Sequence, residues 1–437
     1  MHFRVTPSTL VDAAVTVPGD KSVSHRALML GSIAEGRTEV SGFLAGEDCL
    51  STMAAMRQLG VSIEQHSATE VSVDGVGLHG LQAPTAELDL GNSGTAMRLM
   101  TGLLAGQPFD SVLTGDESLT GRPMGRIIKP LGEMGAVIDS NDGKPPLTVH
   151  GSKRLTGINY EMPVASAQVK SSILLAGLYA RGATEIVEPA VSRDHTERML
   201  KSMGVYVYVN GNRIGIRGVR RLKACEIKVP ADLSSAAFLI LAALLSEDAE
   251  LLISNVGMNP TRIGVIDILQ EMGANIRFER PQLFGSEPVT DIRVRASQLH
   301  GGTIDPGLVS LAIDEFPVLF VAAAAANGKT VFAGLEELRV KESDRIAAMA
   351  AGLQALGIEV EEKPDGAIVH GGQFKGGTVQ SFGDHRVAMS LAVAGGVADG
   401  EVVVQDTASV ETSFPGFVSC MGSIGAAIER HEDQADG

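Results

Sequence analysis

The stretch RQLGVSIE, residues 57–64, decides the fold of this chain because its pattern returns five more times. A helix-like run ends at Leu59-Gly60, and a run of alternating apolar residues begins at Val61. Glycine just after the last apolar residue is typical of a helix C-terminus. The other copies are GEMGAVID (132–139), KSMGVYVY (201–208), QEMGANIR (270–277), QALGIEVE (354–361) and SIGAAIE (423–429). Such regular recurrence indicates a repeat architecture.

A second set of recurring segments keeps the same period. Each has a short strand pattern, a loop of small residues and a helix rich in Ala, Leu and Met that is apolar on nearly every side, which indicates burial. The helices are expected to open near Ser22, Thr95, Gln168, Ser234, Asp314 and His385. Alternation of strands and helices predicts an α/β protein with mixed strand pairing, and six repeats divide naturally into two groups of three.

Length and two proline-containing junctions suggest the domain organisation. A chain of 437 residues exceeds one ordinary hydrophobic core. Val17-Pro18-Gly19-Asp20 and Val229-Pro230-Ala231-Asp232 stand where the chain would cross between domains. We therefore expect a first domain at 20–231 and a second made of 1–18 and 232–437. Two crossing strands would form a hinge that suits closure around a ligand.

Composition narrows the class of protein. A net charge of −16, 4% aromatic residues and no Trp argue against nucleic-acid binding. Cys49, Cys225 and Cys420 are too few and too far apart for a disulfide framework or a zinc site, which favours a reducing cytoplasm. The N-terminus has no signal-peptide pattern. The longest apolar stretch, Ala236 to Leu245, is too short to span a membrane and predicts a buried helix.

The loop before the first of these helices carries a concentrated set of polar residues. Ser22 is expected to cap the helix, with Lys21 projecting from the turn and Arg26 four residues along the same face. Cations beside a helix N-terminus can bind phosphate or carboxylate. A Walker A loop does not fit, because Asp20 precedes Lys21, and Gly328-Lys329-Thr330 lacks the upstream glycine. A capped helix with solvated cations remains the alternative.

Other loops carry similar signals. Gly94 and Arg122 lie in glycine-containing loops, and Ser166 opens the third helix beside Gln168, where capping is again the simpler explanation. Ser192 begins a charged segment in which His195 has no second His or Cys at metal spacing, so a capped, salt-bridged helix start is favoured over a metal site.

The second half supplies carboxylates. Asp314-Glu315 begins a helix in an apolar segment, where an ionised carboxylate needs a partner. The run Lys341-Glu342-Ser343-Asp344-Arg345 has the alternating signs of a solvated salt-bridge face, and His385 would cap or pack. Six cations nevertheless lie in such loops of both halves, which describes a site for a substrate with several negative charges: Lys21, Arg26, Arg122, Lys341, Arg345 and Arg386.

Taken together, these loops resemble those of the 5-enolpyruvylshikimate-3-phosphate (EPSP) synthase family. The resemblance covers essentially the whole chain and rests on ordered motifs: PGDKSVSHRA (18–27), LGNSGTAMR (90–98), LTGRPM (119–124), PVASAQVKS (163–171), DE (314–315), ELRVKESDR (337–345) and GDHRVAM (383–389). The motifs GDKS, SAQVK, RDHTE and NPTR (259–262) are similar to the second class of this family. The implied fold has two domains, each an inside-out α/β barrel of three βαβαββ repeats.

The resemblance also implies a reaction: the enolpyruvyl group of phosphoenolpyruvate moves to the 5-hydroxyl of shikimate 3-phosphate through a tetrahedral intermediate. Neither a metal nor an organic cofactor takes part. Asp314 would accept the hydroxyl proton, Glu342 would protonate the methylene carbon, and Lys21 would touch both substrates. His385 and Asp384 would lie in the pocket without an assigned step.

The binding residues carried over by motif form two sets. Shikimate 3-phosphate would contact Lys21, Ser22, Arg26, Ser166, Gln168, Ser192, Asp314 and Lys341. Phosphoenolpyruvate would contact Lys21, Gly94, Arg122, Gln168, Arg345 and Arg386. Two departures from the first class agree with the second: Ala167 replaces a phosphate-binding serine, and the segment Val410 to Ser413 lacks a lysine before Phe414.

Three other functions compete with this interpretation. UDP-N-acetylglucosamine 1-carboxyvinyltransferase uses a loop cysteine, and no Cys lies near Thr120-Gly121-Arg122-Pro123. An RNA 3′-phosphate cyclase would need a basic surface, which a charge of −16 disfavours. A binding scaffold without catalysis would not retain Asp314, Glu342 and the six cations. The expected protein is a cytoplasmic, monomeric enzyme with the two small-molecule substrates and no nucleic-acid or membrane partner.

Overall fold

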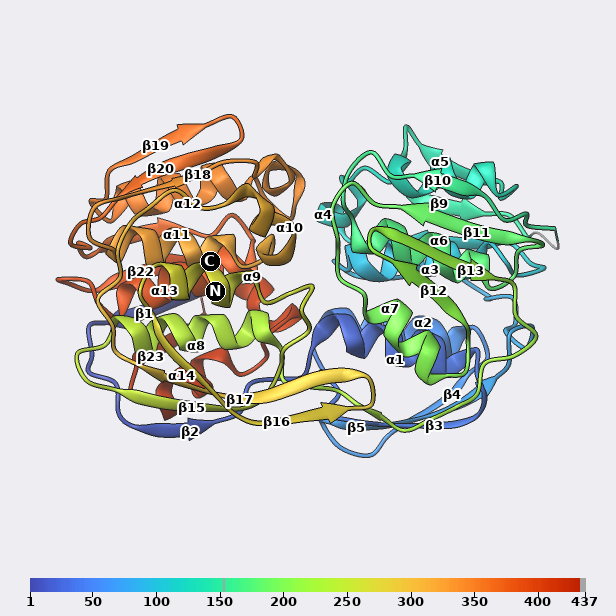
Figure 1. Ribbon diagram of the computed structural model, residues 1–437, viewed down its shortest axis with the longest axis horizontal. Helices are drawn as coiled ribbons and strands as arrows, with labels where there is room; N and C mark the ends of the chain where they lie inside the picture. Colours follow the sequence, from blue (N-terminus) through green and yellow to red (C-terminus); the bar gives the residue numbers. More distant parts are fainter. Residues whose placement is uncertain (152–153, 433–437) are drawn as a thin grey trace, which may run out of the picture. The chain divides into compact units, whose positions relative to one another are not determined.

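The computed structural model describes residues 1–151 and 154–432. The chain divides into two compact units (Figure 1). Unit 1 contains Met1–Pro18, Pro230–Gln282 and Pro288–Gly437, and unit 2 contains Gly19–Val229 with Leu283–Glu287. Each unit has its own hydrophobic core, so each buries its helices independently of the other.

Unit 2 contains three four-stranded sheets of one design. In each, a parallel pair at one edge continues into antiparallel pairs. The strands, in sheet order, are β14 (Ile227–Lys228), β3 (Glu35–Ser41), β5 (Glu70–Val76) and β4 (Ser62–Gln65); β6 (Leu88–Asp89), β7 (Ser111–Thr114), β9 (Lys144–Val149) and β8 (Ile138–Asn141); β10 (Asn159–Glu161), β11 (Ala183–Val187), β13 (Arg213–Arg217) and β12 (Val207–Asn210).

Unit 1 also contains three sheets, and the prediction of mixed strand pairing is confirmed. The strands, in sheet order, are β21 (Gly377–Gln380), β22 (Val402–Gln405), β1 (His2–Thr6) and β23 (Ala427–His431); β16 (Asn275–Phe284), β17 (Glu287–Arg295), β15 (Glu250–Gly257) and β2 (Ala13–Val15); β18 (Lys329–Phe332), β20 (Gly366–His370) and β19 (Val360–Lys363). In the three-stranded sheet, an isolated parallel bridge between Thr303 and Val331 takes the position that a parallel edge strand has in the other sheets. The first strand β1 runs antiparallel to the last strand β23, with His2 opposite His431.

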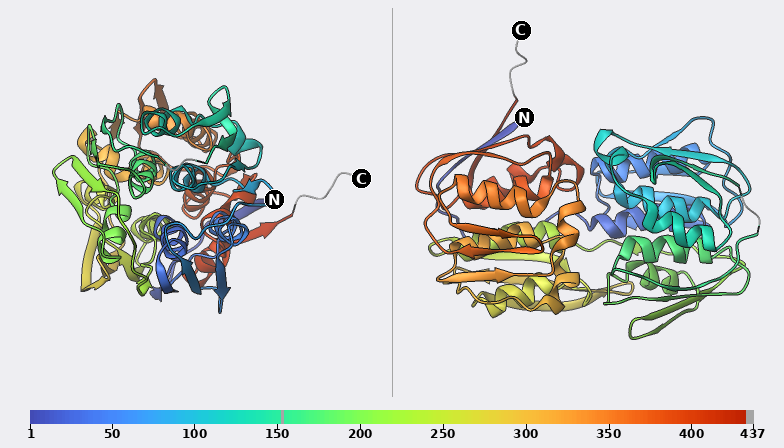
Figure 2. Two further views of the ribbon diagram at one scale, coloured as in Figure 1. Left: turned by 90° about the vertical axis from the view of Figure 1, so that its right-hand side faces the viewer. Right: turned by 90° about the horizontal axis from the view of Figure 1, so that it is seen from above.

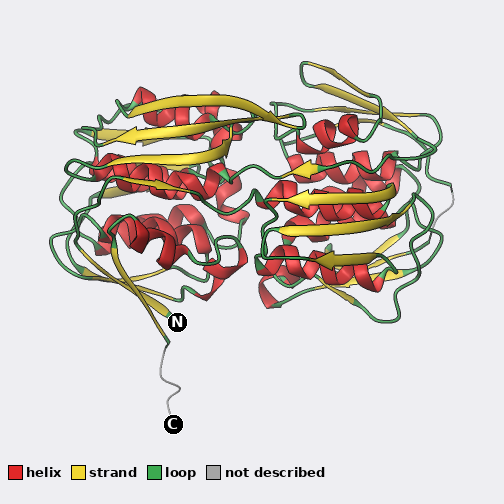
Figure 3. Ribbon diagram, turned by 90° about the horizontal axis from the view of Figure 1, so that it is seen from below, coloured by secondary structure: helices red, strands yellow, loops and turns green. Residues whose placement is uncertain are grey.

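The strands of each unit lie on the outside of that unit, and its long helices run beneath them (Figure 2, Figure 3). The helices of unit 2 are α1 (Lys21–Ser32), α2 (Glu47–Gln58), α3 (Gly94–Leu104), α4 (Glu117–Thr120), α5 (Gly125–Glu133), α6 (Ala167–Gly177) and α7 (His195–Ser202). Those of unit 1 are α8 (Leu233–Leu245), α9 (Gly264–Glu271), η1 (Pro306–Leu308), α10 (Val309–Ala312), α11 (Phe316–Ala325), η2 (Glu336–Val340), α12 (Arg345–Ala355), α13 (His385–Gly395), η3 (Ala408–Thr412) and α14 (Phe417–Ser423).

The expected helices are present, and their burial follows the apolar pattern. Helix α8 is buried from Leu233 to Leu244, which confirms the buried helix predicted for the longest apolar stretch. The fifth helix differs from expectation: α11 begins at Phe316, and Asp314 lies in the turn that separates it from α10. Helices α3 and α6 approach each other closely at Gly102, where an added Cβ would stand 2.1 Å from the carbonyl oxygen of Ser172 in α6.

The six recurring glycines end helices as predicted. All have a positive φ, which non-glycine residues adopt at a cost. The values are +86° at Gly60, +96° at Gly135, +84° at Gly204, +100° at Gly273, +82° at Gly357 and +95° at Gly425. The repeated sequence signal is therefore a repeated backbone requirement.

Candidate active site

The N-terminus of α1 positions the first group of polar side chains in unit 2. Asp20, and not Ser22, caps this helix: its Oδ1 accepts a hydrogen bond from the Val23 amide at 2.8 Å. The predicted cap was wrong because the helix begins at Lys21, which makes Asp20 the N-cap and places Ser22 in the first turn. Lys21 forms an ion pair with Asp48, 3.0 Å between Nζ and Oδ2, and keeps 17% of its side chain exposed. An ammonium beside a helix N-terminus is suited to an anionic ligand.

Arg26, one turn further along α1, is buried among neutral oxygens. Its Nε donates to Thr196 Oγ1 at 2.7 Å, Nη2 to Ser171 Oγ at 2.8 Å, and Nη1 to the Ser22 carbonyl at 2.9 Å. Burial lowers the pKa of Arg26 to about 10. The guanidinium thus stays charged at neutral pH and is held firmly by α1, α6 and α7.

His25 links α1 to the helices beside it. Its Nδ1 lies 2.8 Å from Thr52 Oγ1, and its Nε2 lies 3.4 Å from Ser93 Oγ. The Thr52 hydroxyl donates to the Asp48 carbonyl, so it accepts from Nδ1–H, which leaves Nε2 to accept from Ser93. Burial first, and then the charges of Lys21 and Arg26, hold the pKa of His25 well below 6.5. His25 is a neutral structural link.

The N-terminus of α3 brings Gly94 and Arg122 together. Ser93 caps the helix through the Ala96 amide at 3.1 Å. A Cβ on Gly94 would stand 3.1 Å from Arg122 Nη1, so the missing side chain leaves room for this guanidinium. Arg122 is buried, and its Nη2 donates to Asn92 Oδ1 at 2.5 Å and to Ser118 Oγ at 3.2 Å.

A further arginine, Arg98, joins this group and was not singled out from the sequence. Its Nη1 donates to Gln168 Oε1 at 2.7 Å, and Gln168 Nε2 donates to Thr95 Oγ1 at 2.9 Å. Arg98 therefore ties the predicted binding residue Gln168 of α6 to the start of α3. The signal was present, because Arg98 is the last residue of the LGNSGTAMR motif.

Ser166 caps α6 through the Val169 amide at 3.4 Å, as the simpler interpretation predicted. Ser192 donates a very short hydrogen bond to Glu188. Lys170 was not among the residues selected from the sequence. Its buried Nζ lies 2.9 Å from Glu188 Oε1, 2.8 Å from Glu197 Oε1 and 3.1 Å from the Ser192 carbonyl. Burial opposes its charge, but the two glutamates outweigh burial and raise the pKa of Lys170.

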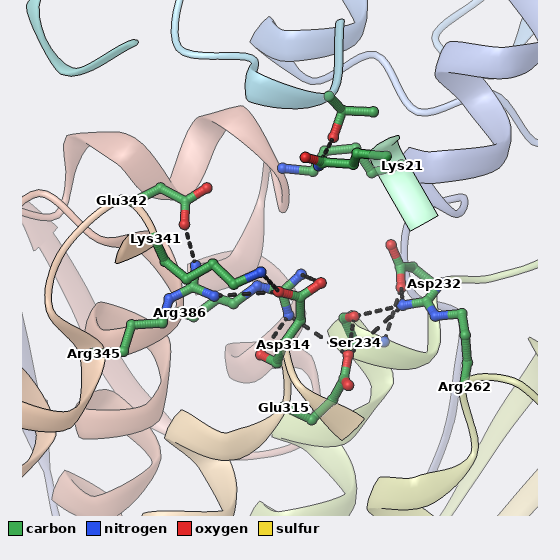
Figure 4. A network of polar contacts seen from close by, with 12 residues as sticks. Lys21, Asp232, Ser234, Arg262, Asp314, Glu315, Lys341, Glu342, Arg345 and Arg386 are labelled. Carbon is green, nitrogen blue, oxygen red and sulfur yellow. Dashed lines mark hydrogen bonds and ion pairs between the residues drawn. The ribbon is translucent and has the colours of Figure 1, made fainter. Parts of the chain in front are cut away.

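In unit 1, the turn between α10 and α11 presents Asp314 to three cations (Figure 4). Its carboxylate lies 3.7 Å from Lys341 Nζ, 3.4 Å from Arg345 Nη1 and 4.0 Å from Arg386 Nη2. The Asp314 side chain keeps 18% of its surface exposed, so a ligand can reach it. The structure thus brings together the unit 1 residues selected from the sequence.

Arg345 contradicts the prediction of a solvated charged face. Only 1% of its side chain is exposed, and it bonds Asp384 through Nε at 2.8 Å and Glu342 through Nη2 at 2.7 Å. Burial opposes the charge, but Asp384, Glu342 and Asp314 outweigh it and raise the pKa of Arg345. The run looked solvated because two of these partners, Asp314 and Asp384, come from other segments of the chain. Glu342 keeps 22% of its side chain exposed.

The start of α13 positions Arg386. Asp384 caps this helix by accepting from the Arg386 amide at 2.9 Å, while its other oxygen binds Arg345. The Arg386 side chain donates from Nη1 to the Asp314 carbonyl at 3.0 Å. His385 is buried at the helix start, as one of its two interpretations predicted. The Asp384 carboxylate therefore positions both the Arg345 side chain and the backbone of Arg386.

Residues 1–151 and 154–432 lack both a metal-ligand group and a helix able to span a membrane. Within these ranges no group of three or more His, Cys, Asp or Glu is arranged to hold a metal ion. Across the same part of the chain, none of the helices has the length and apolar character that crossing a membrane requires.

Comparison with known proteins gives one consistent result. Residues 5–421 match the family model described as EPSP synthase (3-phosphoshikimate 1-carboxyvinyltransferase). The chain is 56% identical to the 3-phosphoshikimate 1-carboxyvinyltransferase of Alkalilimnicola ehrlichii, covering 98% of this chain and 97% of the relative. The corresponding protein of Methylococcus capsulatus is 55% identical, with 98% of each covered. A solved EPSP synthase structure from Acinetobacter baumannii is similar with a TM-score of 0.88 and 50% identity, over 98% of this chain and 99% of that one.

Proposed function

Since this chain belongs to the EPSP synthase (3-phosphoshikimate 1-carboxyvinyltransferase) family, we infer that it transfers the enolpyruvyl group of phosphoenolpyruvate to the 5-hydroxyl of shikimate 3-phosphate. Inorganic phosphate is the second product, and the reaction belongs to the shikimate pathway. The observation that carries this function is identity of 55–56% to curated relatives over nearly the whole chain. The same identity argues against the rival UDP-N-acetylglucosamine 1-carboxyvinyltransferase and cyclase interpretations.

We propose that Asp314 takes the proton from the 5-hydroxyl as its oxygen attacks C2 of phosphoenolpyruvate. Glu342 delivers a proton to the methylene carbon, which gives a tetrahedral intermediate. The methyl carbon formed in this way then returns a proton to Glu342, the double bond re-forms, and the C2–O bond to phosphate breaks as the proton held by Asp314 passes to the departing phosphate. Two partly exposed carboxylates among cations support this division of work.

The cations bind and neutralise the anionic groups. We propose that phosphoenolpyruvate is held by Lys21, Gly94, Arg122, Gln168, Arg345 and Arg386. Shikimate 3-phosphate is held by Lys21, Ser22, Arg26, Ser166, Gln168, Ser192, Asp314 and Lys341. The way the guanidinium groups are held supports this proposal. Buried Arg345 and Arg26 already have fixed hydrogen-bond partners, so they need little reorganisation when a substrate binds.

The finer assignments are also proposals. Residues 20–231 and residues 1–18 with 232–437 act as two domains, and both contribute binding residues. The second class is supported by Ala167, by the absence of Lys from Val410 to Ser413, and by the NPTR motif. We further propose a monomer located in the cytoplasm; sedimentation and cell fractionation test these two points.

The decisive test gives purified protein both substrates and measures phosphate release together with enolpyruvylated product. Asp314→Asn and Glu342→Gln should each lower kcat by about 10²–10⁴-fold, the usual contribution of general acid–base catalysis. Asp305→Asn removes the same charge from an exposed aspartate that caps η1 and serves as the matched control. Lack of turnover by wild-type protein would reject the function, and near-normal rates of the two variants would reject their roles.

A further inference from the structure

A buried polar network next to Asp314 takes no part in the proposed proton transfers. It consists of Asp232 and Ser234 at the start of α8, Arg262 before α9, and Glu315 before α11 (Figure 4). The exposed fractions of the Arg262 and Glu315 side chains are 4% and 1%. Buried charges are retained at a cost, so this pair needs an explanation.

Arg262 is the centre of the network. Its Nη2 donates to Ser234 Oγ at 2.6 Å and to Asp232 Oδ1 at 3.1 Å, and lies 3.7 Å from Glu315 Oε1. The Ser234 hydroxyl in turn donates a very short hydrogen bond to the same Glu315 oxygen. Arg262 therefore neutralises Glu315 both directly and through Ser234.

Glu315 also faces the arginine of the active site. Its Oε1 lies 3.7 Å from Arg386 Nη1, and that nitrogen donates to the Asp314 carbonyl at 3.0 Å. One carboxylate oxygen thus stands at equal distance from Arg262 and Arg386. If Arg262 were absent, Arg386 would still lie 3.7 Å from the buried Glu315 carboxylate.

We propose that Arg262 is a positioning residue for the enolpyruvyl donor: by engaging the Glu315 carboxylate, it keeps Arg386 available to the anionic groups of phosphoenolpyruvate. This inference rests on the proposed function, in which Arg386 binds that substrate. Glu315 without Arg262 competes with the substrate for the Arg386 guanidinium. Glu315 with Arg262 does not, because its charge is already engaged.

The test is a double-mutant cycle with Arg262→Met, Glu315→Gln and the combined variant. Arg262→Met alone should raise KM for phosphoenolpyruvate about tenfold, as expected for coupled residues in contact, and change KM for shikimate 3-phosphate much less. In the Glu315→Gln background the Glu315 charge no longer competes for Arg386, and the Asp314 carboxylate, 4.0 Å from Arg386 Nη2, is the same with or without Arg262. The same change should therefore leave KM for phosphoenolpyruvate nearly unaltered. Inhibition by inorganic phosphate, measured as a second anion probe, should weaken and recover in parallel.

Controls separate this inference from a general loss of stability. Glu287→Gln in unit 2 alters another buried carboxylate contact, the 2.8 Å hydrogen bond between Glu287 Oε1 and His195 Nδ1, and should lower thermal stability without changing KM for phosphoenolpyruvate. If Arg262→Met does not fold, Arg262→Lys replaces it in the same cycle with a smaller expected effect. Equal effects of the Arg262 change with and without the Glu315 carboxylate would overturn the inference. An inactive wild-type protein would instead overturn the proposed function.

Discussion

Replacing His25 by Gln should remove a pH-dependent contribution to the stability of unit 2. The ring is fully buried between Thr52 and Ser93, and its pKa is held well below 6.5 by burial and then by Lys21 and Arg26. In the unfolded chain the same ring takes up a proton at its ordinary pKa. Between these two pKa values the unfolded state therefore binds more protons than the folded state, and stability rises with pH.

The size of the effect follows from this difference. Above the unfolded pKa of 6.5 the contribution of neutral His25 is fully present, and it is lost as the pH falls towards the folded pKa. At pH 5.5 about ten of every eleven unfolded rings are protonated, which lowers the free energy of unfolding by about 1.4 kcal/mol relative to pH 8. His25→Gln has no ring to protonate, so its change between these pH values should be smaller than wild type by about that amount.

Urea unfolding at pH 5.5 and pH 8 measures the difference between wild type and His25→Gln. Thr52→Val is the matched control, because it removes the hydrogen bond at Nδ1 but keeps the ring and should keep the pH dependence. Nitrogen NMR of labelled histidine should show His25 neutral, with the proton on Nδ1, throughout this range. A His25 signal that titrates near pH 6.5, or an unchanged pH dependence in His25→Gln, would refute the argument.

Three other substitutions test separate parts of the structure. Gly102→Ala places a Cβ 2.1 Å from the Ser172 carbonyl oxygen and should cost about 1–3 kcal/mol, measured as a lower melting temperature; an unchanged value would show that α3 and α6 can separate freely. Lys170→Met leaves buried Glu188 and Glu197 without their ammonium; burial raises the pKa of Glu188 even with Lys170 present, so the loss of stability should be greater at pH 8 than at pH 5, and calorimetry at both values decides. Gly94→Ala crowds the flexible end of Arg122 at 3.1 Å and should raise KM for phosphoenolpyruvate while circular dichroism stays unchanged; an unaltered KM contradicts the proposed contact.

Local patterns predicted the elements of the fold well because their causes are local. A glycine with positive φ ends each of six helices, and Gly60 or Gly357 can be recognised from its neighbours alone. Apolar residues on every side likewise marked α8 as buried. The cap of α1 was assigned wrongly to Ser22, because Asp20 is also a good capping residue and only the backbone decides between them.

Contacts between distant segments explain what the sequence did not reveal. Arg345 sits in an alternating charged run that is locally identical to a solvated one, and its burial depends on Asp384 at the start of another helix. Arg262 and Glu315 were quoted within the NPTR and DE motifs but given no role of their own, since their shared partner Ser234 lies far from both along the chain. Charge patterns within one element carry no information about carboxylates that another element supplies.

The pairing of the first strand with the last has a consequence for protein engineering. Because His2 stands opposite His431, the first and last strands of the chain, β1 and β23, are already neighbours, and a short linker could join their ends. A circularly permuted gene that starts at Pro230 would then encode unit 1 as a single run interrupted only at Leu283–Glu287, followed by Gly19–Val229 as one block. The long interruption of unit 1 by Gly19–Val229 thus reflects the order of segments along the chain rather than how its sheets are built.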